Sequence, residues 1–225
     1  MRIAIAGSNG RMGTAIMGVI GGLDDAEVVA EIEQENSGRL ADIISETRPD
    51  VYVEFTNPEA TLRNSEVAAG AGIPLVVGTT GFSEEQQETL ERIVRESNVA
   101  AVICPNMSRG VNVLRGLLEN LNGILPEDFS VEITDVHHRN KKDAPSGTAK
   151  MFQNTLNRFG PEIHSVRAGS VPGTHTITCL GDGEQLEITH RAESRNCFAA
   201  GTVQAARFVV GREPGVYSMS DVLCQ

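Results

Sequence analysis

The feature that most constrains this chain is the alternation of strand-like and helix-like segments through its first hundred residues. Short apolar runs such as Arg2–Ala6 and Glu27–Ile32 alternate with stretches whose apolar side chains recur at helical spacing, such as Arg11–Ile20. Such alternation with short connections predicts a parallel sheet with helices on both faces. The further strands expected are Asp50–Phe55, Pro74–Gly78 and Ala100–Cys104, and the further helices are residues 38–47, 58–71 and 84–96.

The pattern changes after Pro105. A helix is expected at Gly110–Leu125 and another at Thr148–Phe159. The strands expected here are Phe129–His137, Ile163–Ala168, Thr174–Leu180 and Gln185–Ala192. Strands that cluster late predict a second, α+β domain built on an open mixed sheet with helices on one face. The last segment, residues 198–210 followed by 217–223, is expected to be helical and to pack on the first domain. The expected domains are residues 1–106 completed by 198–225, and residues 107–197.

Composition excludes several classes of partner. The formal net charge of −11 argues against nucleic acid, whose phosphates need a basic face. The strand-like start leaves no room for a signal peptide, and no apolar run approaches membrane-spanning length. The four cysteines are scattered, as is typical of reduced thiols, and no cluster of residues shows metal-ligand spacing. We therefore expect a cytoplasmic protein with no metal and no membrane partner.

A glycine-rich turn joins the first strand to the first helix. It consists of Gly7, Ser8, Asn9, Gly10, Arg11, Met12 and Gly13. Its strand–turn–helix context is typical of a site where backbone approaches a pyrophosphate at a helix N-terminus. Glu33 ends the second strand 20 residues after Gly13, where a carboxylate can accept hydrogen bonds from ribose hydroxyls. The spacing is GxxGxxG instead of the commoner GxGxxG, and a turn that only packs helix on strand is the alternative. The pattern predicts dinucleotide binding in a Rossmann-like domain.

Loops at the carboxyl ends of the other strands extend this predicted site. They contribute Phe55, Gly78, Thr79, Thr80, Pro105, Asn106 and Met107. Each segment taken alone is better explained by an ordinary turn. Together they fit a cofactor lying across the strand ends, where open α/β sheets bind ligands.

Gln34 bears on which cofactor is used. A 2′-phosphate is usually bound at this point by a guanidinium, and Gln34 is neutral. Arg11 is the alternative cation, leaning from the glycine turn over the adenosine side. We therefore expect NADH to be used at least as well as NADPH.

The run from His137 to Thr148 gathers cationic and proton-donating residues in an otherwise acidic chain. It passes directly into Pro-Ser-Gly-Thr, a helix start with free backbone donors, in which Pro145 would preset the first turn. A solvated charged face is the alternative for a run of this kind. Proton donors, fixed cations and a helix N-terminus together favour a small, multiply anionic substrate.

Several of these motifs occur in one order along a known family. They are Gly7-x-x-Gly10-Arg11-Met12-Gly13, Gly78-Thr79-Thr80-Gly81, the Asn106–Asn112 segment, and His137-His138-x-x-Lys141-x-Asp143-Ala144-Pro145-Ser146-Gly147-Thr148. On these motifs the chain resembles the 4-hydroxy-tetrahydrodipicolinate reductases, also called dihydrodipicolinate reductases. The resemblance implies reduction of a cyclic dicarboxylate by NADH or NADPH in the diaminopimelate route to lysine. It also implies a homotetramer, with residues 107–197 serving substrate binding and oligomerisation.

The resemblance assigns roles within the histidine–lysine run. His137 would be the acid/base group, and Lys141 the proton donor and cationic partner beside it. His138 would contact one substrate carboxylate. Ser146, Gly147 and Thr148 would hold a carboxylate through backbone and hydroxyl donors at the helix start. Either His137 or Lys141 could deliver the proton.

Other residues and other functions stay open at this level. His175 could be a packing residue and Asp143 a turn or orienting residue. Arg167 and Arg195 could form ion pairs within the fold or contact the substrate, and neither is assigned to the catalytic set. One alternative function is a two-domain reductase of an aspartate- or semialdehyde-like acid. The other is a catalytically silent nucleotide sensor.

Overall fold

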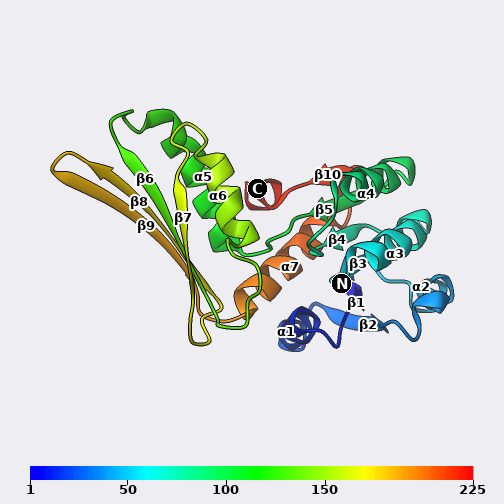
Figure 1. The fold of residues 1–225 in the computed structure, drawn as a ribbon. Coiled ribbons are helices and arrows are strands. Elements are labelled where there is room, and N and C mark those ends of the chain that lie inside the picture. Colours follow the sequence, from blue (N-terminus) through cyan, green and yellow to red (C-terminus); the bar gives the residue numbers. More distant parts are fainter. Residues whose placement is uncertain (225) are drawn as a thin grey trace. The chain divides into compact units, whose positions relative to one another are not determined.

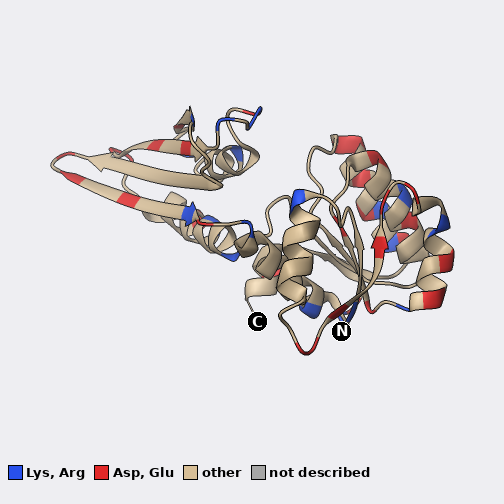
Figure 2. Cartoon of the chain, turned by 90° about the horizontal axis from the view of Figure 1, so that it is seen from below, with Lys and Arg blue, Asp and Glu red and all other residues tan. Residues whose placement is uncertain are grey.

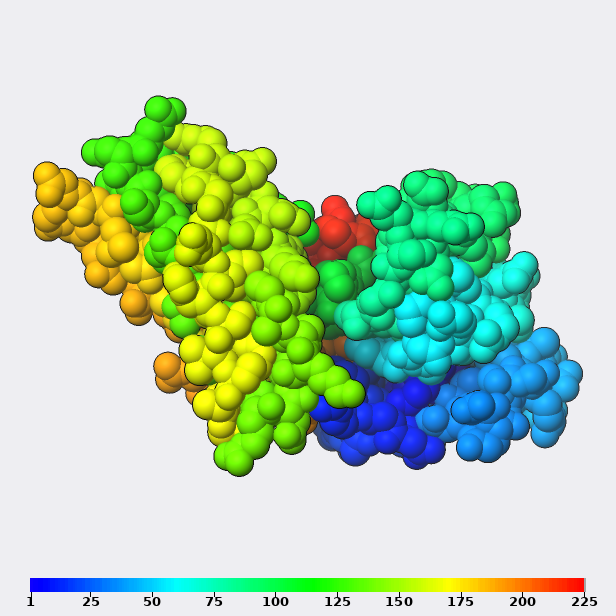
Figure 3. Space-filling view, in the orientation of Figure 1, coloured from blue at the N-terminus to red at the C-terminus, as the bar shows by residue number. Residues whose placement is uncertain are grey.

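The computed structural model describes residues 1–224, which divide into two compact units. One unit combines Met1–Ser108 with the chain from Phe198 onward, and the other is Arg109–Cys197. The chain therefore leaves the first unit and returns to it, so that the red C-terminal segment belongs with the blue and cyan residues (Figures 1 and 3). Among the described residues, no helix has both the length and the apolar character needed to cross a membrane.

The first unit is built on a six-stranded parallel sheet with the strand order β10-β5-β4-β3-β1-β2. Its strands are β1 (Arg2–Ala6), β2 (Glu27–Ile32), β3 (Val51–Glu54), β4 (Leu75–Val77), β5 (Ala100–Ile103) and β10 (Gly215–Tyr217). Its helices are α1 (Arg11–Ile20), α2 (Leu40–Thr47), α3 (Pro58–Gly70), α4 (Glu84–Glu96), α7 (Asn196–Val209) and α8 (Met219–Leu223), with a 3₁₀ turn η1 (Ser37–Arg39). The expected Rossmann-like sheet is confirmed.

Alternation along the strands places a hydrophobic core on each face of this sheet. Ile3 and Ile5 of β1 pack in one core with α1 and α7, whereas Ala4 and Ala6 pack in the other with α2, α3 and α4. Figure 1 shows helices on both sides of the strands. Both cores are continuous, so the strand ends and their loops rest on a rigid support.

The C-terminal segment differs in part from the expected helices. Gly215–Tyr217 forms the edge strand β10, which pairs in parallel with β5, and only Met219–Leu223 is helical. A three-residue strand is too short for an alternating pattern to reveal it. It is defined instead by pairing with a strand more than a hundred residues earlier. The Tyr217 ring then packs edge-on against Phe208 of α7, with ring centroids 5.3 Å apart.

The second unit carries a four-stranded mixed sheet with the order β7-β6-β8-β9. Its strands are β6 (Ser130–His137), β7 (Glu162–Arg167), β8 (Gly173–Gly181) and β9 (Glu184–Ala192), and its helices are α5 (Arg109–Ile124) and α6 (Gly147–Thr155). Both helices lie on the same side of the sheet in Figure 1, which confirms the expected open sheet. Helix α6 ends at Thr155, before the expected Phe159, and Gly160 follows with a positive φ of 55°.

Alternation in β6 determines which side chains reach the helix-covered face. Val131, Ile133, Asp135 and His137 are buried there, whereas Glu132 and the other intervening residues face outward. The register places Asp135 opposite His175 of β8 and His137 beside Arg167 of β7. Polar side chains are thereby brought together at the end of an otherwise apolar face.

Candidate functional site

The glycine turn of the first unit is closely packed. The Gly7 N–H donates to the carbonyl of Ile32, and a Cβ on Gly13 would lie 2.1 Å from the Gly7 carbonyl oxygen. Gly10 is the N-cap residue of α1, and because it has no side chain it makes no capping hydrogen bond to the helix. The first N–H groups of α1 are therefore presented without a side-chain cap, which suits an anionic group such as a pyrophosphate.

Glu33 stands beside this turn. One oxygen of its carboxylate accepts hydrogen bonds of 2.7 Å from both the Ser8 hydroxyl and the Asn9 N–H. Ser8 and Asn9 thus hold Glu33 in place. A cavity of about 390 Å³ opens here, and its lining includes Gly7, Gly10, Glu33, Gln34, Ser37, Phe55, Asn57 and Arg63.

A second cavity of about 400 Å³ collects the residues expected at the other strand ends. It is lined by Gly10, Arg11, Met12, Phe55, Thr56, Gly78, Thr79, Thr80, Pro105, Asn106, Met107 and Phe198. Arg11 therefore lines this cavity and not the one beside Glu33, where Arg63 of α3 is the lining cation. Two cavities that share Gly10 and Phe55 fit an extended dinucleotide such as NADH or NADPH.

A buried carboxylate that the sequence analysis missed lies beneath the Phe55–Thr56 loop. Glu54, at the end of β3, is fully buried and accepts hydrogen bonds from the Tyr52 hydroxyl, the Asn64 amide, and both the N–H and the hydroxyl of Thr56. Burial raises the pKa of Glu54 despite these donors. Glu54 fixes the loop that lines both cavities, and its one signal in the sequence is an acid within an apolar strand.

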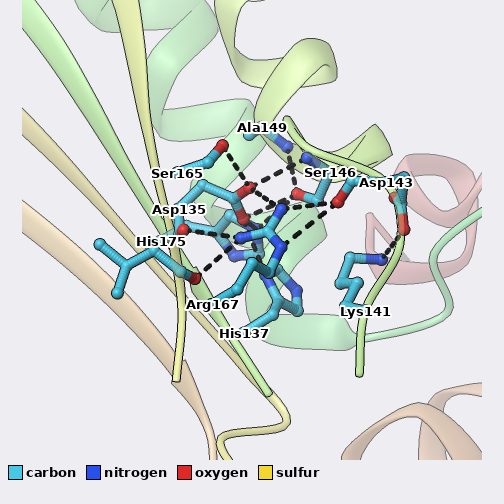
Figure 4. Close-up of polar contacts among 10 residues, drawn as sticks. Asp135, His137, Lys141, Asp143, Ser146, Ala149, Ser165, Arg167 and His175 are labelled. Atoms are coloured by element: carbon cyan, nitrogen blue, oxygen red, sulfur yellow. Dashed lines mark hydrogen bonds and ion pairs between the residues drawn. The ribbon is translucent and has the colours of Figure 1, made fainter. Parts of the chain in front are cut away.

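In the second unit, His137 lies against a buried aspartate. Its Nδ1 is 2.8 Å from Oδ1 of Asp135, whose side chain is 0% exposed (Figure 4). Burial would raise the pKa of Asp135, but the close contacts with the rings of His137 and His175 and the hydrogen bond from Arg167 outweigh it and hold that pKa well below its usual range. The carboxylate is therefore ionised at neutral pH.

Lys141 lies on the loop between β6 and α6. Its Nζ is 2.9 Å from a carboxylate oxygen of Asp143, and its side chain is 24% exposed. Burial of Asp143 is outweighed by the hydrogen bond and charge of Lys141, so that the pKa of Asp143 is lowered. Asp143 thus has the position of an orienting partner for the lysine.

The start of α6 differs from the expected arrangement. Ser146 is the N-cap, so Pro145 precedes the cap and does not occupy the first turn; the Ala144–Pro145 peptide bond is cis. The Ser146 N–H and hydroxyl both donate to Asp135, and its oxygen also accepts from the Ala149 N–H. Ser146 is thus buried and engaged within the protein, whereas Gly147 is exposed and Thr148 half-buried at the same helix start.

The sequence analysis missed Asp135, although it lies at a buried position of an alternating strand. It left Arg167 between an internal ion pair and a substrate contact, and the structure places the guanidinium 2.8 Å from Asp135. Asp135, His137 and His175 offer possible metal-ligand atoms within 4.8 Å of one another. This set does not suit a metal, because the Arg167 guanidinium already provides the cation for the carboxylate.

Hydride transfer from a nucleotide to an anionic substrate requires a nucleotide cradle and a positioned proton donor. The first unit has the cradle, and the second unit has a buried histidine next to a lysine-bearing loop. The fold and these sites define a two-domain, pyridine-nucleotide-dependent oxidoreductase.

Comparisons with known proteins define the family. The family models described as Dihydrodipicolinate reductase, N-terminus, and Dihydrodipicolinate reductase, C-terminus, match residues 1–107 and 110–223. The 4-hydroxy-tetrahydrodipicolinate reductase of Methanothermobacter thermautotrophicus is 40% identical, with 99% of this chain and 98% of that protein covered. That of Methanoculleus marisnigri is also 40% identical, with 99% of each covered. The chain belongs to the dihydrodipicolinate reductase family.

Solved structures agree with the fold. Dipicolinate-bound dihydrodipicolinate reductase from Paenisporosarcina sp. TG-14 matches with a TM-score of 0.83 at 22% identity, covering 97% of each chain. The DAP dehydrogenase of C. glutamicum, solved in complex with DAP, matches with a TM-score of 0.61 at 10% identity, covering 97% of this chain and 92% of that chain. These likenesses establish the architecture alone.

Proposed function

We propose that this protein reduces 4-hydroxy-tetrahydrodipicolinate to tetrahydrodipicolinate with NADH or NADPH, a step of the diaminopimelate route to lysine. One substrate, one reduced nucleotide and one proton give one product, one oxidised nucleotide and one water. The observation that carries the proposal is the buried His137–Asp135 pair at the root of the Lys141 loop, ahead of the α6 N-terminus. The names of the curated relatives support the same reaction.

The residues of the first unit would hold the nucleotide. The N–H groups at the start of α1 bind its pyrophosphate, Glu33 faces the adenosine ribose, and the residues of the second cavity surround the nicotinamide side. When bound, the reduced nicotinamide supplies the hydride. Glu54 keeps the Phe55–Thr56 loop in place beneath it.

The residues of the second unit would bind the dicarboxylate and move the proton. His137 acts as the acid/base group through Nε2, because Nδ1 faces Asp135. Lys141 is the cationic partner, and it compensates the negative charge that hydride addition leaves on the ring. His138, Gly147 and Thr148 bind the carboxylates, and Ser146 maintains the helix start that presents them.

A direct assay tests this function. The purified protein is given the condensation product of pyruvate and aspartate semialdehyde, and loss of nicotinamide absorbance is followed with NADH and NADPH in parallel. We expect substrate-dependent oxidation, with NADH used at least as well as NADPH because Gln34 is neutral and Glu33 is anionic. Nucleotide binding without oxidation would instead favour a different acidic substrate or a nucleotide sensor.

Two variants test the assigned chemistry. Losing a general acid costs about 10²- to 10⁴-fold in rate, so His137→Ala and Lys141→Ala should each reduce kcat within that range. Nucleotide binding, measured by fluorescence titration, should barely change, because the cradle belongs to the other unit. Near-normal turnover in both variants would rule out this mechanism.

The assembly and location complete the proposal. The outward face of the second unit's sheet carries β-branched side chains, and Val166 on it is 44% exposed. Such a face suits self-association, which supports the homotetramer implied by the family. We place the protein in the cytoplasm with its soluble substrates. Sedimentation equilibrium at micromolar concentration tests the assembly, and a mass of one chain would contradict it.

A further inference from the structure

We propose that Asp135 and Arg167 form a positioning pair for the reaction, with Asp135 orienting His137 and Arg167 anchoring the loop that carries Lys141. This inference rests on the proposed function. The sequence analysis did not single out Asp135, and it left Arg167 between an internal ion pair and a substrate contact. The contacts that support the pair all lie within the second unit.

Asp135 is the centre of a buried polar cluster. Its Oδ1 meets Nδ1 of His137 at 2.8 Å, the Ser146 hydroxyl at 2.9 Å and Nε2 of His175 at 3.4 Å. Its Oδ2 accepts from the Ser146 N–H at 2.9 Å, from Nη2 of Arg167 at 2.8 Å and from the Ser165 hydroxyl at 3.3 Å. One carboxylate thus joins strands β6, β7 and β8 to the start of α6 (Figure 4).

This arrangement determines how the His137 ring is presented. Nδ1 is the ring nitrogen that lies 2.8 Å from the Asp135 carboxylate, which favours a proton on Nδ1 of the neutral ring and leaves Nε2 as the nitrogen for proton exchange. The opposite side of the ring lies against Gly173, where a Cβ would be 3.0 Å from Nε2. The ring is therefore held between a carboxylate and a strand that has no side chain at that point.

Arg167 connects the Asp135 carboxylate to the loop that carries Lys141. Its guanidinium donates to the Asp143 carbonyl at 2.8 and 3.3 Å, and to the Asp135 carbonyl at 3.1 Å. The Asp143 side chain in turn pairs with Lys141. His137 and Ser146, at the two ends of the loop, both contact Asp135. Asp143, within the loop, is held by Arg167.

Kinetics of Asp135→Asn and Arg167→Lys test the pair, with Asp182→Asn in the exposed β8–β9 turn as the matched control. We expect Asp135→Asn to lower kcat about 100-fold, within the range for loss of a general acid, while KM changes little. Arg167→Lys should lower kcat about 10-fold, since an ammonium cannot reproduce the bridging fork. The control should retain its rate.

The double variant Asp135→Asn/His137→Ala separates positioning from independent action. If Asp135 acts through His137, the double variant should be no slower than His137→Ala alone. A double variant slower by the product of the two single losses would overturn the proposal. So would an unchanged kcat in Asp135→Asn.

A spectroscopic measurement keeps the proposal testable if a variant fails to fold or the substrate is wrong. ¹⁵N NMR of the wild-type protein, with the His137 signals assigned by their loss in His137→Ala, should show neutral His137 protonated at Nδ1. Neutral His137 protonated at Nε2 would overturn the proposed orientation. This result needs no substrate, so it is independent of whether the proposed reaction is correct.

Discussion

At the scale of single residues, two buried carboxylates behave in opposite ways because their partners differ. Asp135 pairs with a guanidinium, and its pKa is lowered. Glu54 accepts hydrogen bonds only from neutral groups, and burial raises its pKa. A neutral hydrogen-bond donor offsets less of the free-energy cost of desolvating a carboxylate than a positively charged donor does. Asp135 is thus ionised in the folded protein, whereas Glu54 holds its proton more tightly than in the unfolded chain.

The raised pKa of Glu54 predicts a specific pH dependence of stability. The folded state binds this proton more tightly than the unfolded state, so the contribution is present below the unfolded pKa of about 4.3 and is lost as pH rises through the folded pKa. Glu54→Gln has no ionisable group at this position, so its stability does not include this decrease with rising pH. Melting temperatures measured between pH 4.5 and 8 should therefore fall more steeply with pH in the wild type than in Glu54→Gln. An exposed control, Glu85→Gln, should follow the wild type, and parallel curves for Glu54→Gln would contradict the account.

Gly173 provides a second prediction at the residue scale. A Cβ there would lie 3.0 Å from Nε2 of His137, so the ring must shift by a few tenths of an ångström. Misplacing a reacting group is costly, and we expect Gly173→Ala to lower kcat about 10-fold while the protein stays folded. Gly116→Ala is the matched control, because nothing lies within 4 Å of a Cβ at Gly116. Equal rates in the two variants would argue against a tightly held His137.

At the scale of elements, the sequence pattern predicted most of the fold, because the helices bury one face and the strands of the parallel sheet, which are buried on both faces, are short apolar runs. It did not predict β10, whose three residues are set by pairing with β5. It also did not reveal Asp135 as a site residue, because contacts to β7, β8 and α6 depend on strand register. The glycine turn and the His137–Lys141 run were visible because their chemistry is local in sequence.

The glycine turn gives the prediction that belongs to this scale. A Cβ on Gly13 would lie 2.1 Å from the Gly7 carbonyl, so Gly13→Ala must displace α1 from the turn. The N–H groups of α1 would then no longer be aligned for a pyrophosphate, and we expect NADH affinity to fall by at least about 10-fold. Gly18→Ala on the same helix has open space around it and should bind normally. Fluorescence titration measures both, and unchanged affinity in Gly13→Ala would contradict the assigned cradle.

At the scale of the whole molecule, the proposed roles fall in different units. The proposed nucleotide cradle lies in the unit of Met1–Ser108 and the chain from Phe198 onward, and the proposed proton donor lies in Arg109–Cys197. Many acidic side chains lie on the helices of the first unit, as Figure 2 shows. Glu84 and Glu85 in the first turn of α4 are examples. The chain as a whole is acidic, so the cationic groups near His137 are a local provision for an anionic substrate.

Hydride transfer to the cyclic dicarboxylate is the central step of the proposed reaction. The direct test uses NADH deuterated at the transferable position of the nicotinamide, together with the condensation product of pyruvate and aspartate semialdehyde. Mass spectrometry of the product should show tetrahydrodipicolinate carrying one deuterium for each NADH oxidised. Oxidation of NADH that leaves no deuterium in tetrahydrodipicolinate, or no oxidation with this substrate, would contradict the account.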